Sequence, residues 1–189
     1  MNTKGQKIRA KIIGAANRLF YQRGFQAASF SDLARESGIP KGNYYFHFKA
    51  KEDLLAAVIQ DRSDRLKIQL DHWRDTIENP KERLRRTSRM IERSRDDLVA
   101  YGCPLGTLVA ETVKSHPSHK NQLAEMLRMI ENWMAEQMVD LGLEPDQARR
   151  RARAFLGIMQ GAAVLAAAYG DADVIAQAVH DLDTEIDTL

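Results

Sequence analysis

Apolar residues recur at the spacing of an α-helix along nearly the whole chain, and glycine or proline marks most interruptions. Ile8, Ile12, Leu19 and Phe20 set this rhythm in the first segment, on one face of a helix. No segment alternates apolar and polar residues as a half-buried strand does, and the 189 residues include five prolines. The pattern predicts an all-α fold of about nine helices, near residues 8–23, 30–37, 40–47, 51–73, 81–99, 105–113, 117–134, 147–169 and 173–187.

Charge is distributed unevenly along the chain. Residues 1–52 carry ten basic and three acidic side chains, a net charge of +7. Residues 53–189 carry 18 basic and 23 acidic side chains, a net charge of −5. We therefore predict a small basic domain over residues 1–50 and a larger helical domain over 51–189. The asymmetry indicates that only the first domain meets a polyanion, although a solvated basic surface would give the same count.

The remaining composition bears on compartment and chemistry. The single cysteine allows no internal disulfide, which fits a reducing compartment. No signal-peptide core follows Met1, and the longest apolar run, Ala162–Tyr169, is too short to cross a bilayer. His116 and His119 flank Pro117, and neither a metal-ligand cluster nor a nucleophile–base pair accompanies them. We expect a cytoplasmic protein that does not contact a membrane, is not an enzyme and holds no metal or cofactor.

Residues 29–47 contain the signals of two short helices joined by a tight turn. Ser29 and Asp32 form a capping pair at the start of the first helix, and Gly38 can adopt the left-handed conformation that ends it. Pro40 suits the first turn of the second helix, where a missing N–H costs nothing. This spacing is typical of a helix-turn-helix, whose second helix enters the major groove of DNA.

The second helix of this motif carries side chains suited to contact with DNA. Lys41 lies at its start, where a cation and free backbone amides attract a phosphate, and Gly42 allows a close approach. Asn43 can pair with a base edge. Phe48 and Leu54 are expected to face inward and fix the angle of the helix. Further donors are expected from Tyr44, Tyr45, His47 and Lys51.

Four segments within residues 7–55 follow one known pattern. They are Arg23-Gly24-Phe25, Leu33-Ala34-Arg35-Glu36-Ser37-Gly38-Ile39, Lys41-Gly42-Asn43-Tyr44-Tyr45-Phe46-His47-Phe48 and Lys51-Glu52-Asp53-Leu54. Together they resemble the TetR family of bacterial repressors, except that Pro40 stands where the family commonly carries serine or threonine. The resemblance implies a ligand-responsive repressor that binds a palindromic operator in double-stranded DNA as a homodimer. The implied DNA-binding residues are Ser29, Ser31, Lys41, Gly42, Asn43, Tyr44, Tyr45, His47 and Lys51, with Asn43 and Tyr44 at base edges.

The resemblance also implies a dimer interface and a pocket for a small-molecule effector in the larger domain. Similar proteins pair their last two long helices with those of a partner, although the same apolar pattern also fits burial within one chain. The residues predicted for the interface are Phe155, Ile158, Ala162, Leu165, Ala166, Tyr169, Ile175, Val179 and Leu182. The residues predicted to line the pocket, most of which also suit a plain core, are Met90, Cys103, Met126, Met129, Trp133, Phe155 and Met159.

Cys103 raises an alternative mode of sensing. Gly102-Cys103-Pro104 resembles a segment of a subset of the family, in which some members detect quinones or other electrophiles through the cysteine. A thiolate is favoured near a helix start, and Lys114 and His116 lie nearby in sequence. A buried cysteine that acts as a small hydrophobic residue explains the same position. The competing reading of the whole chain is an all-helical ligand carrier or enzyme with an incidental basic domain.

Overall fold

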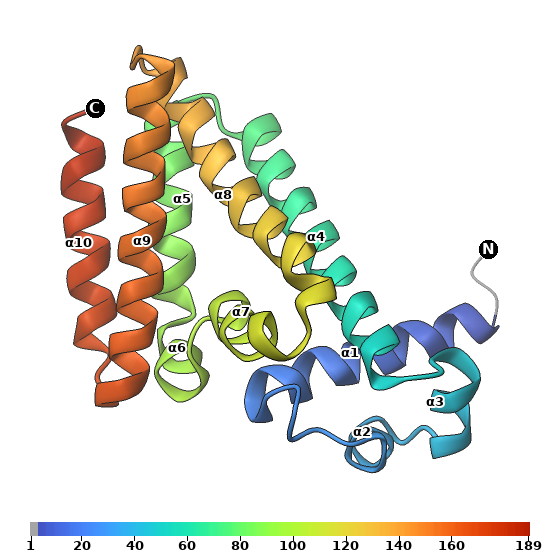
Figure 1. The fold of residues 1–189 in the computed structure, drawn as a ribbon. Coiled ribbons are helices and arrows are strands. Elements are labelled where there is room, and N and C mark those ends of the chain that lie inside the picture. The colour runs from blue at the N-terminus through green and yellow to red at the C-terminus, as the bar shows by residue number, and fades with distance from the viewer. Residues whose placement is uncertain (1–3) are drawn as a thin grey trace. The chain divides into compact units, whose positions relative to one another are not determined.

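The computed structural model describes residues 4–189, and every regular element in this range is helical (Figure 1). The predicted all-α class is confirmed. The elements are α1 (Lys4–Arg23), α2 (Phe30–Ser37), α3 (Lys41–His47), α4 (Lys51–Thr76), α5 (Pro80–Arg93), α6 (Arg95–Tyr101), α7 (Pro104–Ser115), the short 3₁₀ helix η1 (Pro117–His119), α8 (Lys120–Asp140), α9 (Pro145–Tyr169) and α10 (Asp173–Asp187). The single helix predicted over residues 81–99 is divided into α5 and α6, because the backbone of Ser94 leaves the helical conformation at φ −101° and ψ 11°.

The chain forms two compact units, and their boundaries differ from the predicted division after residue 50. The N-terminal unit comprises the described residues up to Arg65 together with Thr107–Leu123, and the C-terminal unit comprises Leu66–Gly106 and Ala124–Leu189. The start of α4 belongs to the N-terminal unit because Leu54, Leu55 and Val58 are buried in its interior. Helices α4, α7 and α8 therefore contribute residues to both units.

The N-terminal unit is organised around α1. One face of this helix is buried, and it contacts α2, which in turn contacts α3. Phe20, at the end of α1, meets the ring of Phe25 edge-on at 5.1 Å between centroids. Burial of each large apolar side chain contributes about 1.5–3 kcal/mol. Phe48 and Leu54 are buried as expected, so the segment after α3 is held to the same interior.

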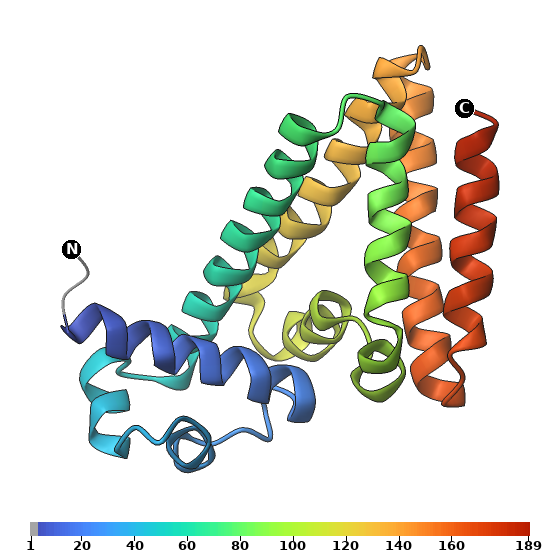
Figure 2. The ribbon, with the colours of Figure 1, turned by 180° about the vertical axis from the view of Figure 1, so that it is seen from behind.

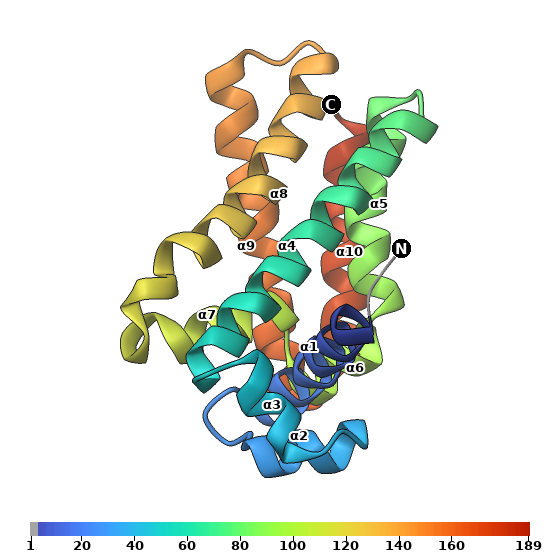
Figure 3. The same cartoon turned by 90° about the vertical axis from the view of Figure 1, so that its right-hand side faces the viewer.

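The C-terminal unit has one continuous hydrophobic core. Helix α9 contacts α6 and α10, and α10 also lies beside α5 (Figures 2 and 3). The core includes Leu84 of α5, Trp133 and Met134 of α8, and Phe155 of α9. The buried hydroxyl of Ser88 on α5 donates to a carboxylate oxygen of Asp183 on α10 at 2.6 Å, which satisfies a polar group at this helix contact.

Helix α9 is long and apolar enough to cross a membrane by length and composition alone. The apolar segment of α9 is therefore longer than the run at residues 162–169 that was noted from the sequence. Eight of its side chains, from Ala148 to Ala166, are buried inside the unit. The core helix of a folded domain has the same length and composition, so α9 is weak grounds for a membrane span.

Candidate nucleic-acid interface

The turn between α2 and α3 is set by local interactions. The Ser29 hydroxyl accepts a hydrogen bond from the backbone N–H of Asp32 at 3.1 Å, and the Asp32 carboxylate accepts from the backbone N–H of Ser29 at 3.1 Å. Hydrogen bonds from the Ser29 hydroxyl and backbone, with help from Arg35, hold the pKa of Asp32 below its ordinary value. Gly38 ends α2 in the left-handed region at φ 68°, as predicted. Ser29, which was predicted to contact DNA, thus caps the start of α2.

Helix α3 presents one exposed face. Lys41, Gly42, Tyr45 and Phe46 are exposed along it, while Asn43 and His47 are half-buried at its edges. The ammonium of Lys41 lies 6.0 Å from the centre of the Tyr45 ring, whose other neighbour is Phe30 of α2. A Cβ placed on Gly42 would meet nothing within 4 Å, so packing inside the described chain does not require glycine there. Ser31 is exposed on α2.

Tyr44 lies on the opposite, buried face of α3, and the prediction that it offers its hydroxyl to a base is wrong. Its exposed fraction is 0%, and its hydroxyl donates to the carbonyl of Leu33 at 2.7 Å. A second hydrogen bond of 2.6 Å joins it to the Ser37 hydroxyl. Burial raises the pKa of Tyr44 above its ordinary value. Tyr44 therefore ties α3 to α2 and has no free donor for a ligand.

Lys51, which was predicted to contact DNA, has a structural role in the chain. Its ammonium donates to the carbonyl oxygens of Phe25, Gln26 and Ala28 at 3.0, 3.2 and 3.1 Å. An ammonium has three donors, and all three are used here. The group also lies 4.5 Å from the centre of the Phe25 ring. Lys51 thus fastens the start of α4 to the loop that leads into α2.

Glu111 on α7 holds the same loop through hydrogen bonds, and no sequence motif predicted this contact. Its carboxylate accepts from the backbone N–H groups of Phe25 and Gln26 at 2.8 and 2.6 Å. A Cβ on Gly24, whose φ is +83°, would lie 3.0 Å from a carboxylate oxygen of Glu111. The partners are separated by 85 and 86 residues, so only the folded chain brings them together.

The two histidines near Pro117 have local partners. The ring of His116 meets Phe25 edge-on at 5.0 Å, and its Nδ1 lies 2.8 Å from the Ser115 hydroxyl. The Nδ1 of His119 lies 3.1 Å from the side-chain oxygen of Gln122. Within residues 4–189, no group of three or more His, Cys, Asp or Glu side chains is placed to hold a metal ion.

The residues predicted for a dimer interface differ in exposure. Three are exposed on α9, namely Ile158, Leu165 and Tyr169, whose exposed fractions are 40%, 44% and 67%. Val179 of α10 is half-buried. The remainder face the core of their own unit, because α9 and α10 pack on each other, and the prediction is wrong for them as surface residues: Phe155, Ala162, Ala166, Ile175 and Leu182. Val164, which was not predicted, is 65% exposed.

The residues predicted for the effector pocket lie in and beside the hydrophobic core. Met126, Phe155 and Met159 are buried, and Met90 and Cys103 pack against the core. The Sγ of Cys103 accepts from the backbone N–H of Gly106 at 3.4 Å. Only two of the predicted residues, Met129 and Trp133, border the cleft described next.

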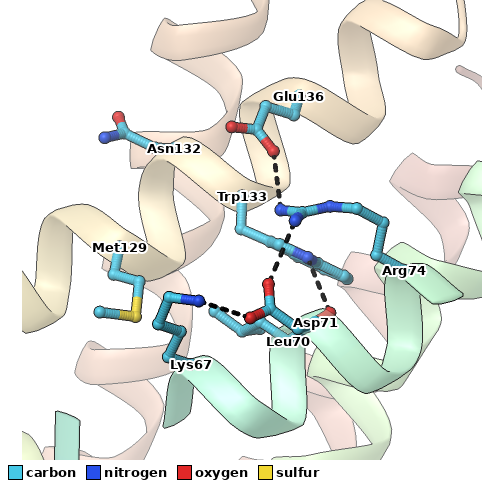
Figure 4. A pocket seen from close by; sticks show the side chains of 8 residues that line it. All are labelled: Lys67, Leu70, Asp71, Arg74, Met129, Asn132, Trp133 and Glu136. Atoms are coloured by element: carbon cyan, nitrogen blue, oxygen red, sulfur yellow. Dashed lines mark hydrogen bonds and ion pairs between the residues drawn. The ribbon is translucent and has the colours of Figure 1, made fainter. Parts of the chain in front are cut away.

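A cleft of about 290 Å³ lies between α4 and α8 in the C-terminal unit (Figure 4). Arg74 bridges the two helices, with contacts of 3.1 Å to both Asp71 and Glu136. Lys67 lies 2.7 Å from Asp71, so it joins the same network of ion pairs. The Trp133 ring N–H donates to the carbonyl of Leu70 at 3.2 Å. The cleft is lined by Lys67, Leu70, Asp71, Arg74, Met129, Asn132, Trp133 and Glu136.

A three-helix N-terminal group with a capped turn and an exposed basic helix, followed by a larger helical unit, defines a helix-turn-helix transcriptional regulator. Comparison with known proteins identifies the family. Residues 12–58 match the sequence model of the bacterial regulatory proteins of the tetR family, and residues 80–180 match that of the LmrA/YxaF-like transcriptional regulator C-terminal domain. The chain belongs to the TetR family of transcriptional regulators.

Similar proteins cover most of the chain. An uncharacterized HTH-type transcriptional regulator of Lactococcus lactis subsp. lactis is 27% identical over 176 residues, 90% of this chain and 88% of that protein. The HTH-type transcriptional regulator LmrA of Bacillus subtilis is 30% identical over 114 residues, 58% of this chain and 60% of that protein. A TetR regulator from Legionella pneumophila shares the fold with a TM-score of 0.86 at 24% identity, over 98% of this chain and 99% of that one.

Proposed function

We propose that this regulator binds a palindromic operator as a homodimer, with α3 of each protomer in the major groove, and represses transcription until a small molecule releases it. The observation that carries the proposal is the exposed face of α3, on which Lys41, Gly42 and Tyr45 lie together. Lys41 and Tyr45 supply donors for phosphates and bases, while Gly42 leaves room for the duplex to approach. Ser31, Asn43 and His47 extend this face.

The test of this DNA-binding face uses the full chain and duplexes selected by it from a random library. Lys41→Ala and Tyr45→Ala are each expected to abolish retardation of the selected duplex while the dimer stays intact. Lys120→Ala, an exposed lysine at the start of α8, is the matched control and is expected to bind as the wild type does. Wild-type binding by both α3 variants would overturn the assignment.

The proposed dimer buries the outward face of α9. Ile158, Leu165 and Tyr169 follow one another by seven and four residues, which places them on one stripe of the helix. Gly161 is exposed beside them, and a Cβ there would meet nothing within 4 Å, so a second helix can approach closely. A two-fold operator requires two recognition helices roughly 34–36 Å apart, or a multiple of that distance, and a dimer provides them.

Sedimentation and operator binding test the dimer together. Leu165→Lys is expected to shift the chain to monomers and to weaken operator binding, because a charge on each protomer would face its symmetry mate. Val139→Lys, at an exposed apolar position of α8, is the control and is expected to remain dimeric. A dimer of undiminished stability in Leu165→Lys would place the interface elsewhere.

The effector is proposed to enter the cleft between α4 and α8. Binding there would compete with the bridge that Arg74 makes to Asp71 and Glu136. Lys51 and Arg74 lie 23 positions apart on the one continuous helix α4. Since Lys51 holds the loop before α2, a shift of α4 would move the helix-turn-helix. Release requires that the effector bind the two states with different affinity.

Tryptophan fluorescence can report binding in this cleft, because both tryptophans of the chain lie at or near it. Trp73 and Trp133 lie 5.8 Å apart between ring centroids, and Trp133 lines the cleft. A compound that fills the cleft is expected to change tryptophan emission in Trp73→Phe, where Trp133 is the only emitter, and Arg74→Met is expected to weaken that binding. A compound that releases the operator without altering this emission would locate the effector site elsewhere.

A further inference from the structure

Phe46 is the most exposed of the large hydrophobic residues within residues 4–189. Its exposed fraction is 82%, compared with 53% for its neighbour Tyr45. Such exposure of a full aromatic ring forfeits the free energy that burial of a ring contributes. A partner that covers the Phe46 ring would therefore gain binding free energy from burying it.

The fold keeps this ring outward. The inward positions of the segment are occupied by Tyr44 and Phe48, which are buried. The Phe46 ring meets the half-buried ring of His47 edge-on, with centroids 5.0 Å apart and an interplanar angle of 87°. In a helix, residues four positions apart share a face, so Phe46 lies beside exposed Gly42 on α3.

The surroundings of Phe46 select a polyanion as the occupant. Lys41 and Lys49 are exposed on either side of it in sequence, and residues 1–52 carry a net charge of +7. A phenylalanine ring has no hydroxyl and offers no hydrogen bond to a phosphate or a base edge. The apolar group that a duplex displays in its major groove is the C5-methyl of thymine.

We propose that Phe46 reads a thymine methyl in each half-site of the operator and so determines sequence specificity. The inference rests on the proposed function, because it requires α3 to lie in the major groove. Lys41 and Tyr45 anchor the helix through polar contacts, and Phe46 adds the apolar contact beside them. A hydroxyl at this position would gain a donor but would not improve the fit to a methyl group.

The experiment removes the methyl alone. Duplexes selected by the full chain from a random library are remade with deoxyuridine in place of each thymine in turn, and affinities are measured by fluorescence anisotropy. At one symmetry-related pair of thymines, the affinity of the wild type is expected to fall about fourfold for each half-site that lacks the methyl. This is the factor that burial of one methyl group contributes. Phe46→Ala is expected to bind more weakly and to lose this sensitivity at the same pair. Ile68→Ala, at an exposed apolar position of α4, is the control and is expected to keep it.

Four outcomes overturn the inference, and they separate it from the proposed function. Selected duplexes without a methyl-sensitive thymine, or a Phe46→Ala variant that keeps the full sensitivity, refute the role of Phe46 while DNA binding stands. Wild-type affinity in Phe46→Ala for every duplex refutes it as well, and points to a protein partner for this ring. Failure of the wild type to enrich any duplex refutes both.

Discussion

Replacement of Lys51 by methionine is expected to destabilise the N-terminal unit without changing how DNA affinity depends on salt. The Lys51 ammonium donates to three carbonyl oxygens at 3.0–3.2 Å, and methionine keeps the apolar stem but no donor. A hydrogen bond from a charged group contributes about 1.5–3 kcal/mol. The three share one partly exposed group and are not additive, so we expect a total loss of about 2–4 kcal/mol. For a chain of this size, that loss lowers Tm by about 5–15 °C.

Two assays separate this structural role from a phosphate contact. Thermal unfolding followed by circular dichroism measures stability, and anisotropy titrations of the selected duplex at several salt concentrations measure the slope of log K against log salt. Each phosphate contact contributes about 0.9 to that slope. Lys51→Met is expected to keep the wild-type slope, and Lys41→Met, the matched lysine on α3, is expected to reduce it. An unchanged Tm with a reduced slope in Lys51→Met would refute the reasoning.

Three further variants test the contacts around this loop and the sensing region. The wild type is expected to lose stability as pH rises from about 10 to the raised pKa of Tyr44, because the tyrosine of the unfolded chain ionises first and favours unfolding. Tyr44→Phe has no phenol to ionise and is expected to show no such loss at this position. Glu111→Gln, measured by urea unfolding, is expected to cost about 1–2 kcal/mol, because its amide nitrogen would face a backbone N–H that the carboxylate now accepts. Cys103→Ser is expected to retain release of the operator by the reversible effector, measured by anisotropy.

Each of these has a result that contradicts it. Parallel stability curves for Tyr44→Phe and the wild type above pH 10 would mean that the phenol is not held neutral. A Glu111→Gln variant as stable as Glu125→Gln, an exposed glutamate of α8, would mean that the clamp contributes nothing. Release by quinones that is lost in Cys103→Ser would establish covalent sensing, the alternative that Cys103 raises.

Elements whose signals are local were predicted closely. The capping pair Ser29 and Asp32 and the left-handed Gly38 bound α2 as expected, since these interactions lie within three residues. The predicted start of α10 at Asp173 also agrees with the structure. The division at Ser94 escaped prediction because no glycine or proline marks it.

The side chains that were misassigned are those whose partners are distant in sequence. Tyr44 has the same hydroxyl as Tyr45, and only its hydrogen bond to Leu33, 11 residues away, shows that it faces the core. Lys51 finds its carbonyl partners 23–26 residues earlier, and Glu111 finds its own 85 and 86 residues earlier. A motif assigns residue types to a helix, but the tertiary contacts decide which of them remain available to a ligand.

The C-terminal half of α9 shows a second reason why side chains were misassigned from the sequence. This part of the helix is apolar almost all round, so periodicity does not distinguish the face that packs on α10 from the face left exposed. Ile158 and Leu165 lie on one side and Phe155 and Ala166 on the other only once the neighbouring helices are in place. The predicted interface therefore combined residues from two faces of α9, one exposed and one buried in the core of the unit.

Selection of duplexes from a random library by the full chain tests the central claim most directly. The account predicts enrichment of a palindrome whose half-site centres lie one helical turn apart, roughly 34–36 Å, or a multiple of it, with two chains bound per duplex. It also predicts that the double variant Lys41→Ala and Tyr45→Ala enriches nothing. Enrichment of the same palindrome by that double variant would contradict the proposal that α3 binds the operator.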